Sequence, residues 1–270
     1  MTNAKIILLD NGSLRPEAIL YLREYAAQLS QRTGKEVAAV SLLHSSKVDA
    51  SLTDGEKAKT LKSFLLEDTD TDTTYYRIVP FFIGASRALT EYLPTVIEEV
   101  QLTRPNINVT IAPHLAHSLG DMQTLAALLS QQIRTTISTR QLRNPSIALV
   151  DHGTPAPEVN AVRNSLTDLV RETLGTEVSD VTACSMERRE GAEYDFNEPL
   201  LENVLKDQKL NEVVVSLLFL SPGRHAGKDG DIAEICAHAE LENENISTHT
   251  TALLSHKFGL LDLLILRSEN

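Results

Sequence analysis

The chain has 270 residues, with 25 Lys and Arg against 37 Asp and Glu, and therefore a formal net charge of −12. Hydrophobic residues make up 42% of it and charged residues 23%, which is typical of a globular protein and excludes a disordered, fibrous or disulfide-stapled one. The acidic balance argues against binding to duplex nucleic acid, because that function requires clustered Lys and Arg.

The sequence also lacks the marks of a secreted or membrane protein. No apolar stretch approaches the roughly 20 residues that a membrane span needs, and the N-terminal residues do not have the pattern of a signal peptide. The two cysteines, Cys184 and Cys236, are far apart, and such sparse use is typical of a reducing compartment. We therefore expect a soluble cytoplasmic protein that binds a small molecule, and neither nucleic acid nor membrane. These features leave its oligomeric state open.

Three segments of the first half recur in the second half in the same order. KIILLDNGSLRPE at 5–17 matches SIALVDHGTPAPE at 146–158, with an offset of 141. VPFFIGASRAL at 79–89 and INVTIAPHLAHSLG at 107–120 match SLLFLSPGRHA at 216–226 and ISTHTTALLSHKFG at 246–259. Because the order and several Gly and Pro positions are kept, we interpret the chain as a duplicated unit. The predicted domains are 1–140 and 145–270.

Strands and helices alternate in each half, and the second half shows the pattern most clearly. The apolar run at 146–151 predicts a buried strand, and the next segment predicts a helix opened by Pro157 and closed by Gly175. Its expected buried stripe consists of Val159, Val162, Leu166, Leu169, Val170 and Leu174. Further strands are expected near 177–184, over 212–220 and over 246–252. Further helices are expected from an N-cap at about Asn197, over 229–240 and over 256–267.

This alternation requires crossover connections, which favour parallel strands with helices on both faces. The first half repeats the same order. We therefore predict an α/β fold of two similar domains, each a four-stranded parallel sheet flanked by helices.

In open α/β sheets, ligands bind beyond the carboxyl ends of the strands. At these positions the second half has His152, Glu187 and His225, one after each of its first three strands. The first half has, at the repeat offsets, Asn11, Ser46 and Ala88. Two imidazoles and a carboxylate can bind a divalent metal and leave positions open for exchange, and an imidazole can also accept a proton. Singly, each histidine could equally cap a helix or lie in a loop. All three side chains at strand ends of one sheet favour a metal or catalytic site.

Four positively charged residues lie close to these positions in the sequence of an otherwise acidic chain. They are Arg188, Arg189, Arg224 and Lys228. Guanidinium groups bind carboxylates through paired hydrogen bonds. We therefore predict that these side chains contact the carboxylates of a substrate, with ordinary surface charge as the alternative.

The motifs VDHGTPAPEVN, CSMERREGAEYDFNEPLLE and LFLSPGRHAG together resemble the class II sirohydrochlorin chelatases, especially the CbiX-type cobaltochelatases. The resemblance implies two similar α/β domains that face each other across a cleft for a tetrapyrrole. It also implies ATP-independent insertion of Co²⁺ or Fe²⁺ into sirohydrochlorin, in cobalamin or sirohaem biosynthesis, with no permanent cofactor. His152 and His225 match the family's active-site histidines, and Glu187 matches its acidic site residue.

The position of the histidine pair departs from part of this family. In the two-domain sirohydrochlorin ferrochelatases the pair lies in the first half, whereas here it lies in the second half. The choice between cobalt and iron stays open. A non-catalytic metal or tetrapyrrole carrier and a structural subunit are the alternatives to an enzyme. If the histidines bind metal, activity is expected to fall below about pH 6, because a protonated imidazole has no free lone pair.

Overall fold

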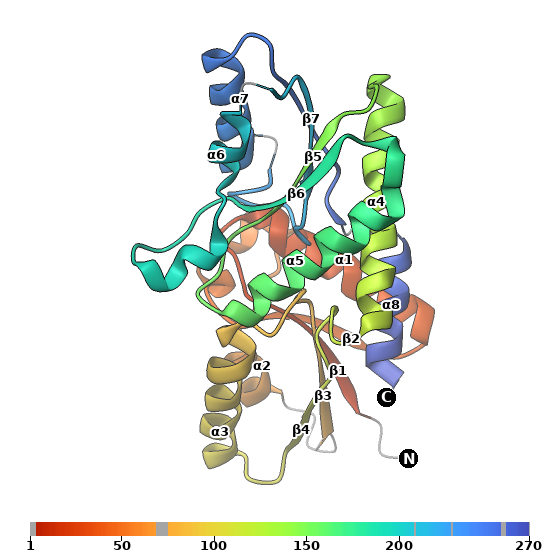
Figure 1. The fold of residues 1–270 in the computed structure, drawn as a ribbon. Helices are drawn as coiled ribbons and strands as arrows, with labels where there is room; N and C mark the ends of the chain where they lie inside the picture. Colours follow the sequence, from red (N-terminus) through yellow and green to blue (C-terminus); the bar gives the residue numbers. More distant parts are fainter. Residues whose placement is uncertain (1–3, 69–74, 208, 228, 255–257, 270) are drawn as a thin grey trace. The chain divides into compact units, whose positions relative to one another are not determined.

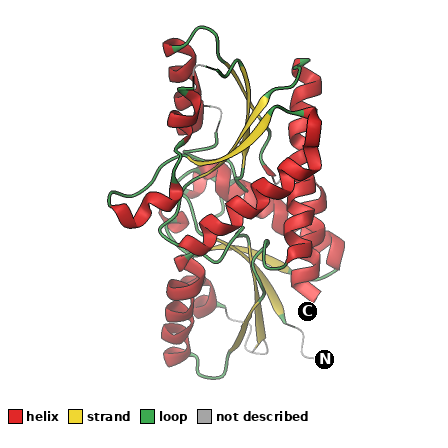
Figure 2. Ribbon diagram, in the orientation of Figure 1, coloured by secondary structure: helices red, strands yellow, loops and turns green. Residues whose placement is uncertain are grey.

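The computed structural model of the chain describes residues 4–68, 75–207, 209–227, 229–254 and 258–269. Its contacts divide the chain into two compact units, 1–117 with 261–270, and 118–260. Each unit contains one four-stranded parallel sheet flanked by helices (Figures 1 and 2). The strand orders are β2-β1-β3-β4 and β6-β5-β7-β8, so the two sheets have the same topology. The predicted fold class is confirmed.

The first unit builds its sheet from short parallel strands. They are β1 (Lys5–Asp10), β2 (Val37–Ser41), β3 (Tyr75–Pro80) and β4 (Asn108–Ile111). The helices that follow the first three strands are α1 (Pro16–Thr33), α2 (Leu61–Glu67) and α3 (Leu93–Thr103). Apolar side chains of α2 and α3 form one core cluster with those of β1, β2 and β3.

The second unit repeats this plan. Its strands are β5 (Ser146–Asp151), β6 (Asp180–Ser185), β7 (Glu212–Leu217) and β8 (Ser247–Thr250). Its helices include α4 (Leu119–Arg140), α5 (Pro157–Leu174), α6 (Leu201–Leu205) and α7 (Asp231–Glu242). In Figure 1, α6 and α7 cover one face of the sheet, and α4 and α5 cover the other. Because both faces are covered, five of the six residues of β5 are buried.

The packing boundary differs from the predicted domain boundary at 140–145. The helix α4 follows β4 in the first repeat, yet it belongs to the second compact unit, where it packs on α5 and β7. Residues 261–270, which include most of α8 (Phe258–Glu269), belong to the first compact unit. There the Arg77 Nε atom donates a hydrogen bond to the Arg267 carbonyl oxygen at 2.6 Å. Each repeat is therefore continuous in sequence, but the helix after its fourth strand belongs to the compact unit of the other repeat. This helix is α4 for the first repeat and most of α8 for the second.

Two predicted helices differ in detail from the structure. The buried face of α5 differs from the predicted stripe, and it includes polar side chains as well as apolar ones. Its buried residues are Asn160, Arg163, Leu166, Thr167, Val170 and Leu174. Asn197 does not cap a helix, since it ends a 3₁₀ turn at Ala192–Asn197 and α6 begins only at Leu201. Its side chain instead bonds the backbone of Thr154.

The other predicted strands and helices of the second half are present, with ends shifted by a few residues. None of the helices in the described part of the chain is both long and apolar enough to cross a membrane.

Candidate metal and substrate site

The three predicted site residues lie together at the carboxyl ends of β5, β6 and β7. The His152 Nε2 atom is 3.4 Å from the Glu187 Oε1 atom. The imidazole rings of His152 and His225 have centroids 4.5 Å apart and planes at 71°. His152 is therefore the central member of the group, in contact with a carboxylate on one side and a second imidazole on the other.

The loops that carry His152 and Glu187 are held tightly to each other. The Glu187 amide donates to the His152 carbonyl oxygen at 3.2 Å, and the Met186 amide donates to the Asp151 carbonyl oxygen at 2.8 Å. Gly153 has φ +92°, and a Cβ atom there would overlap the Glu187 carbonyl oxygen. Glycine is therefore required next to His152, both for the backbone conformation and for the close approach of the second loop.

A buried ion pair lies beneath this turn. The Asp151 Oδ1 atom accepts hydrogen bonds from the Ser185 hydroxyl at 2.6 Å and from the Gly153 amide at 3.1 Å. The Arg163 Nη1 atom lies 3.7 Å from the same oxygen and donates to the Ser185 hydroxyl at 2.5 Å and to the Asn197 carbonyl at 3.2 Å. Burial raises the pKa of Asp151, while the Ser185 bond and the Arg163 charge oppose that rise.

The loop after β7 positions His225 against the start of α7. The His225 Nδ1 atom is 2.6 Å from the Asp231 Oδ2 atom, and Asp231 is the first residue of α7. The Arg224 Nε atom lies 3.5 Å from the same carboxylate oxygen. A cavity of about 350 Å³ lies next to this loop, lined mainly by apolar residues of β7, α7 and the segment after β8.

These contacts are pairwise. Within the residues that the structure describes, no set of three or more His, Cys, Asp or Glu side chains is arranged to hold a metal ion. The side chains of His152, Glu187 and His225 are 46%, 59% and 30% exposed, so all three are accessible to a ligand from solvent.

The predicted carboxylate-binding cations divide into two kinds. Arg188 is engaged within the chain, since its Nε atom donates to Glu198 at 2.8 Å and its Nη1 atom lies 3.3 Å from Asp195. That hydrogen bond lowers the pKa of Glu198. Arg189 and Arg224 are exposed, and Arg189 lies over the ring of Tyr194 with 5.9 Å between the guanidinium carbon and the ring centroid. Lys228 lies outside the described residues.

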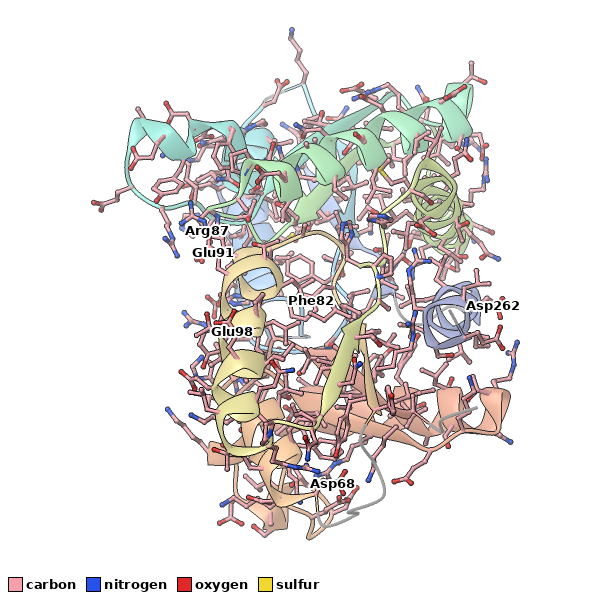
Figure 3. The ribbon with its side chains drawn as sticks, turned by 90° about the horizontal axis from the view of Figure 1, so that it is seen from below. Asp68, Phe82, Arg87, Glu91, Glu98 and Asp262 are labelled. Atoms are coloured by element: carbon pink, nitrogen blue, oxygen red, sulfur yellow. The ribbon has the colours of Figure 1, made fainter. Side chains whose placement is uncertain are left out.

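The first unit keeps the backbone of this site without its chemistry. Gly12 has the same φ of +92°, and a Cβ atom there would overlap the Leu43 carbonyl oxygen. Arg87, which corresponds to Arg224, instead lies 3.7 Å from Glu91 on the turn that leads into α3 (Figure 3). Burial raises the pKa of Asp10, the counterpart of Asp151, to about 6.

Two residues of the site, Asp231 and Arg163, were not predicted from the sequence. Arg163 occurs three residues before Leu166 on the buried face of α5, and Leu22 stands at its repeat position. A charged residue on an apolar face, absent from the other repeat, was the available signal. For Asp231 the signal was weaker, because it is one of several acidic residues after the SPGRHAG motif.

Residues 146–270 match the CbiX family model. The similarity to this model is confined to the second half of the chain. The resemblance to CbiX-type proteins is therefore confirmed over the region where the predicted site residues lie. No curated protein matches the sequence.

Several solved structures share the fold of the whole chain. SirB from Bacillus subtilis with Fe³⁺ matches 98% of this chain and 94% of its own, with a TM-score of 0.71 and 11% identity. The sirohydrochlorin chelatase SirB from Bacillus subtilis subspecies spizizenii, in complex with cobalt, gives a TM-score of 0.69 and 12% identity, over 98% and 93% of the two chains. CbiX, the terminal enzyme for biosynthesis of siroheme in denitrifying bacteria, gives 0.57 and 12%, over 98% and 99%. At these identities the likeness shows the fold.

Proposed function

We propose that this protein is an enzyme that inserts Co²⁺ or Fe²⁺ into sirohydrochlorin without ATP and without a permanent cofactor. The observation that carries the proposal is the contact of His152 with both Glu187 and His225. These residues follow strands of the second half, which is similar to the CbiX family model. The names of the similar structures support it, since two are SirB proteins with iron or cobalt and one is described as a sirohydrochlorin chelatase.

The chemistry of insertion explains this choice of residues. The metal must lose water ligands, and two pyrrole nitrogens must lose protons before they can bind it. His152, His225 and Glu187 would bind the incoming metal as substrate, and the nitrogens of the tetrapyrrole would replace them. A site with few protein ligands releases its metal more easily than a closed site with four. A neutral histidine can also accept a pyrrole proton, and such acid–base help is typically worth about 10²–10⁴-fold in rate.

We propose that the second repeat, 145–270, carries this site and that the first repeat, 1–140, supplies no metal ligand. At the corresponding positions the first repeat has an amide, a hydroxyl and a methyl group, on Asn11, Ser46 and Ala88. None of these is a good ligand for Co²⁺ or Fe²⁺.

Exposed arginines beside the site support a substrate that carries carboxylates. Arg189 and Arg224 are the candidates for contact with them, whereas Arg188 would keep the 188–198 loop in place through Glu198 and Asp195. We propose the cytoplasm as the location, because Cys184 and Cys236 are both free thiols.

Anaerobic absorbance of sirohydrochlorin with Co²⁺, and separately with Fe²⁺, tests the proposed activity. Catalytic amounts of protein should accelerate insertion over the protein-free control through many turnovers. The faster metal would assign the pathway, cobalamin for cobalt and sirohaem for iron. Stoichiometric binding of metal or tetrapyrrole without acceleration would contradict the enzyme and leave a carrier.

A further inference from the structure

We infer that Asp231 is a positioning residue, which holds the His225 imidazole in the tautomer that presents its Nε2 atom to the metal. The inference rests on the proposed function, in which His225 binds the metal. Asp231 itself would touch neither metal nor tetrapyrrole, and it would act only through His225.

The side-chain geometry determines which ring nitrogen of His225 carries the hydrogen. The His225 Nδ1 atom and the Asp231 Oδ2 atom are 2.6 Å apart, within the range of a charge-assisted hydrogen bond. A carboxylate can only accept, so Nδ1 must carry the hydrogen. In the neutral ring the lone pair is then on Nε2, which is the nitrogen left free for a ligand.

Backbone hydrogen bonds hold both residues of the pair in place. The Ile232 amide donates to the His225 carbonyl oxygen at 3.1 Å, and the Asp231 amide donates to the Arg224 carbonyl oxygen at 3.2 Å. A Cβ atom on Gly230 would lie 2.6 Å from the Arg224 oxygen and 2.7 Å from the His225 oxygen, so glycine is required for this close approach. The first turn of α7 is therefore hydrogen-bonded directly to the backbone of Arg224 and His225.

Asp231 lies in the first turn of α7 and beside a cation. The amino-terminal turn of a helix favours carboxylates through its unpaired amides and its dipole. The side chain is 31% exposed, and the guanidinium of Arg224 lies 3.5 Å from Oδ2. The Asp231 side chain is therefore only partly buried, between the helix terminus and the Arg224 guanidinium.

The first repeat supplies an independent observation. At offsets of 137 to 139 from Asp231 it has Pro94, Leu93 and Tyr92, none of which is a carboxylate. The same repeat has Ala88 in place of His225, yet it keeps Arg87 in place of Arg224. At these three positions the repeat that lacks the histidine therefore has no carboxylate, and its Arg87 pairs with Glu91 instead.

Imidazole ¹⁵N chemical shifts test the inference directly at a pH where His225 is neutral, with the His225→Ala variant to assign its signals. The wild-type ring should be protonated on Nδ1 and unprotonated on Nε2. In Asp231→Ala the Nε2-protonated form should become the main one, and Asp231→Asn should favour the same form, because its amide group can donate a hydrogen bond to Nδ1. A wild-type ring protonated on Nε2 would overturn the inference without any variant, so the test does not depend on the folding of Asp231→Ala.

Co²⁺ titration without tetrapyrrole provides the second measurement. Loss of a residue that orients a metal ligand typically weakens binding by about 10–100-fold, and we expect this for Asp231→Ala. The matched control is Glu234→Ala, which also removes one carboxylate from the first turn of α7 and should change the affinity less than about twofold. Equal affinities for Asp231→Ala and Glu234→Ala would overturn the inference.

Neither measurement requires turnover. If the wild-type protein shows the expected tautomer and metal affinity but does not accelerate insertion into sirohydrochlorin, the proposed activity fails and the positioning role of Asp231 stands.

Discussion

The Arg163 guanidinium lies 3.7 Å from the Asp151 carboxylate, and both side chains are buried beneath the turn that carries His152. The side chain of Arg163 is only 2% exposed, although arginine is rarely buried so completely. In the first repeat, Asp10 keeps the position of the aspartate, but Leu22 replaces the arginine. The two repeats therefore differ in the support of the site as well as in its ligands.

Replacement of Arg163 by leucine should destabilise the second unit strongly. The variant leaves Asp151 buried without its cation and removes bonds to Ser185 and Asn197, and such losses typically cost about 3–5 kcal/mol. Chemical denaturation of Arg163→Leu measures the change. Arg171→Leu is the control on the same helix, where a half-exposed arginine should contribute about 1 kcal/mol or less. Equal losses in the two variants would contradict this role of the ion pair.

Asp10 should make the stability of the protein depend on pH. Burial raises the pKa of Asp10 to about 6 in the folded chain, from 3.8 when it is solvated. Between these values the folded state binds more protons than the unfolded state, so stability falls as pH rises from about 4 to 6. The Asp10→Asn variant lacks this titration. Its stability relative to wild type should therefore increase by up to about 3 kcal/mol over that range and then level off.

The comparison of these two proteins at each pH cancels the titrations that they share. Urea denaturation of both, from pH 4 to pH 8, gives the difference directly. A stability difference that does not change with pH would show that Asp10 titrates normally.

A methyl group at Gly153 should disrupt metal binding more than one at Gly12. Both glycines have φ +92° and both approach a carbonyl oxygen, so each alanine variant should lose about 1–3 kcal/mol of stability from backbone strain alone. Only Gly153→Ala moves the carbonyl of Glu187 and the adjacent His152. Co²⁺ titration at a temperature where both variants are folded should show a loss of at least about tenfold for Gly153→Ala and little change for Gly12→Ala. Equal Co²⁺ affinities in the two variants would show that the turn at Gly153 does not support metal binding.

Removal of the charge on Glu187 tests its role as a ligand. Glu187→Gln keeps the size of the side chain but gives a much weaker ligand, so Co²⁺ affinity should fall by at least about tenfold. The control is Glu190→Gln, three residues further along the same loop, where the side chain is also exposed. If both variants bind Co²⁺ as wild type does, Glu187 is not a metal ligand.

The fold could be predicted from the sequence because its signals are local. The apolar runs at 5–10 and 146–151, each followed by a helical pattern that starts at a proline, define a strand and its crossover helix without any tertiary information. The rule that ligands bind at the carboxyl ends of such strands then selected His152, Glu187 and His225, and the structure brings these three together.

The features that were missed depend on contacts between distant segments. Gln132 on α4 donates a hydrogen bond to the carbonyl of Leu253, and no local pattern around α4 indicates that it packs in the second unit. Arg163 was overlooked because an apolar periodicity predicts apolar partners, whereas Asp151 and Ser185 reach the same face of α5 from two different strands. Asp231 required the closed loop before α7, which depends on the backbone of Gly230.

The most direct test of the proposed activity compares two pairs of histidines. The rate of anaerobic Co²⁺ or Fe²⁺ insertion into sirohydrochlorin is measured for wild type, for His152→Ala with His225→Ala, and for His114→Ala with His117→Ala. The second pair lies in the first unit, where its rings are 5.5 Å apart. We predict that the first double variant loses the acceleration over the protein-free control and that the second keeps it. Acceleration that survives the loss of His152 and His225 would contradict a site in the second repeat.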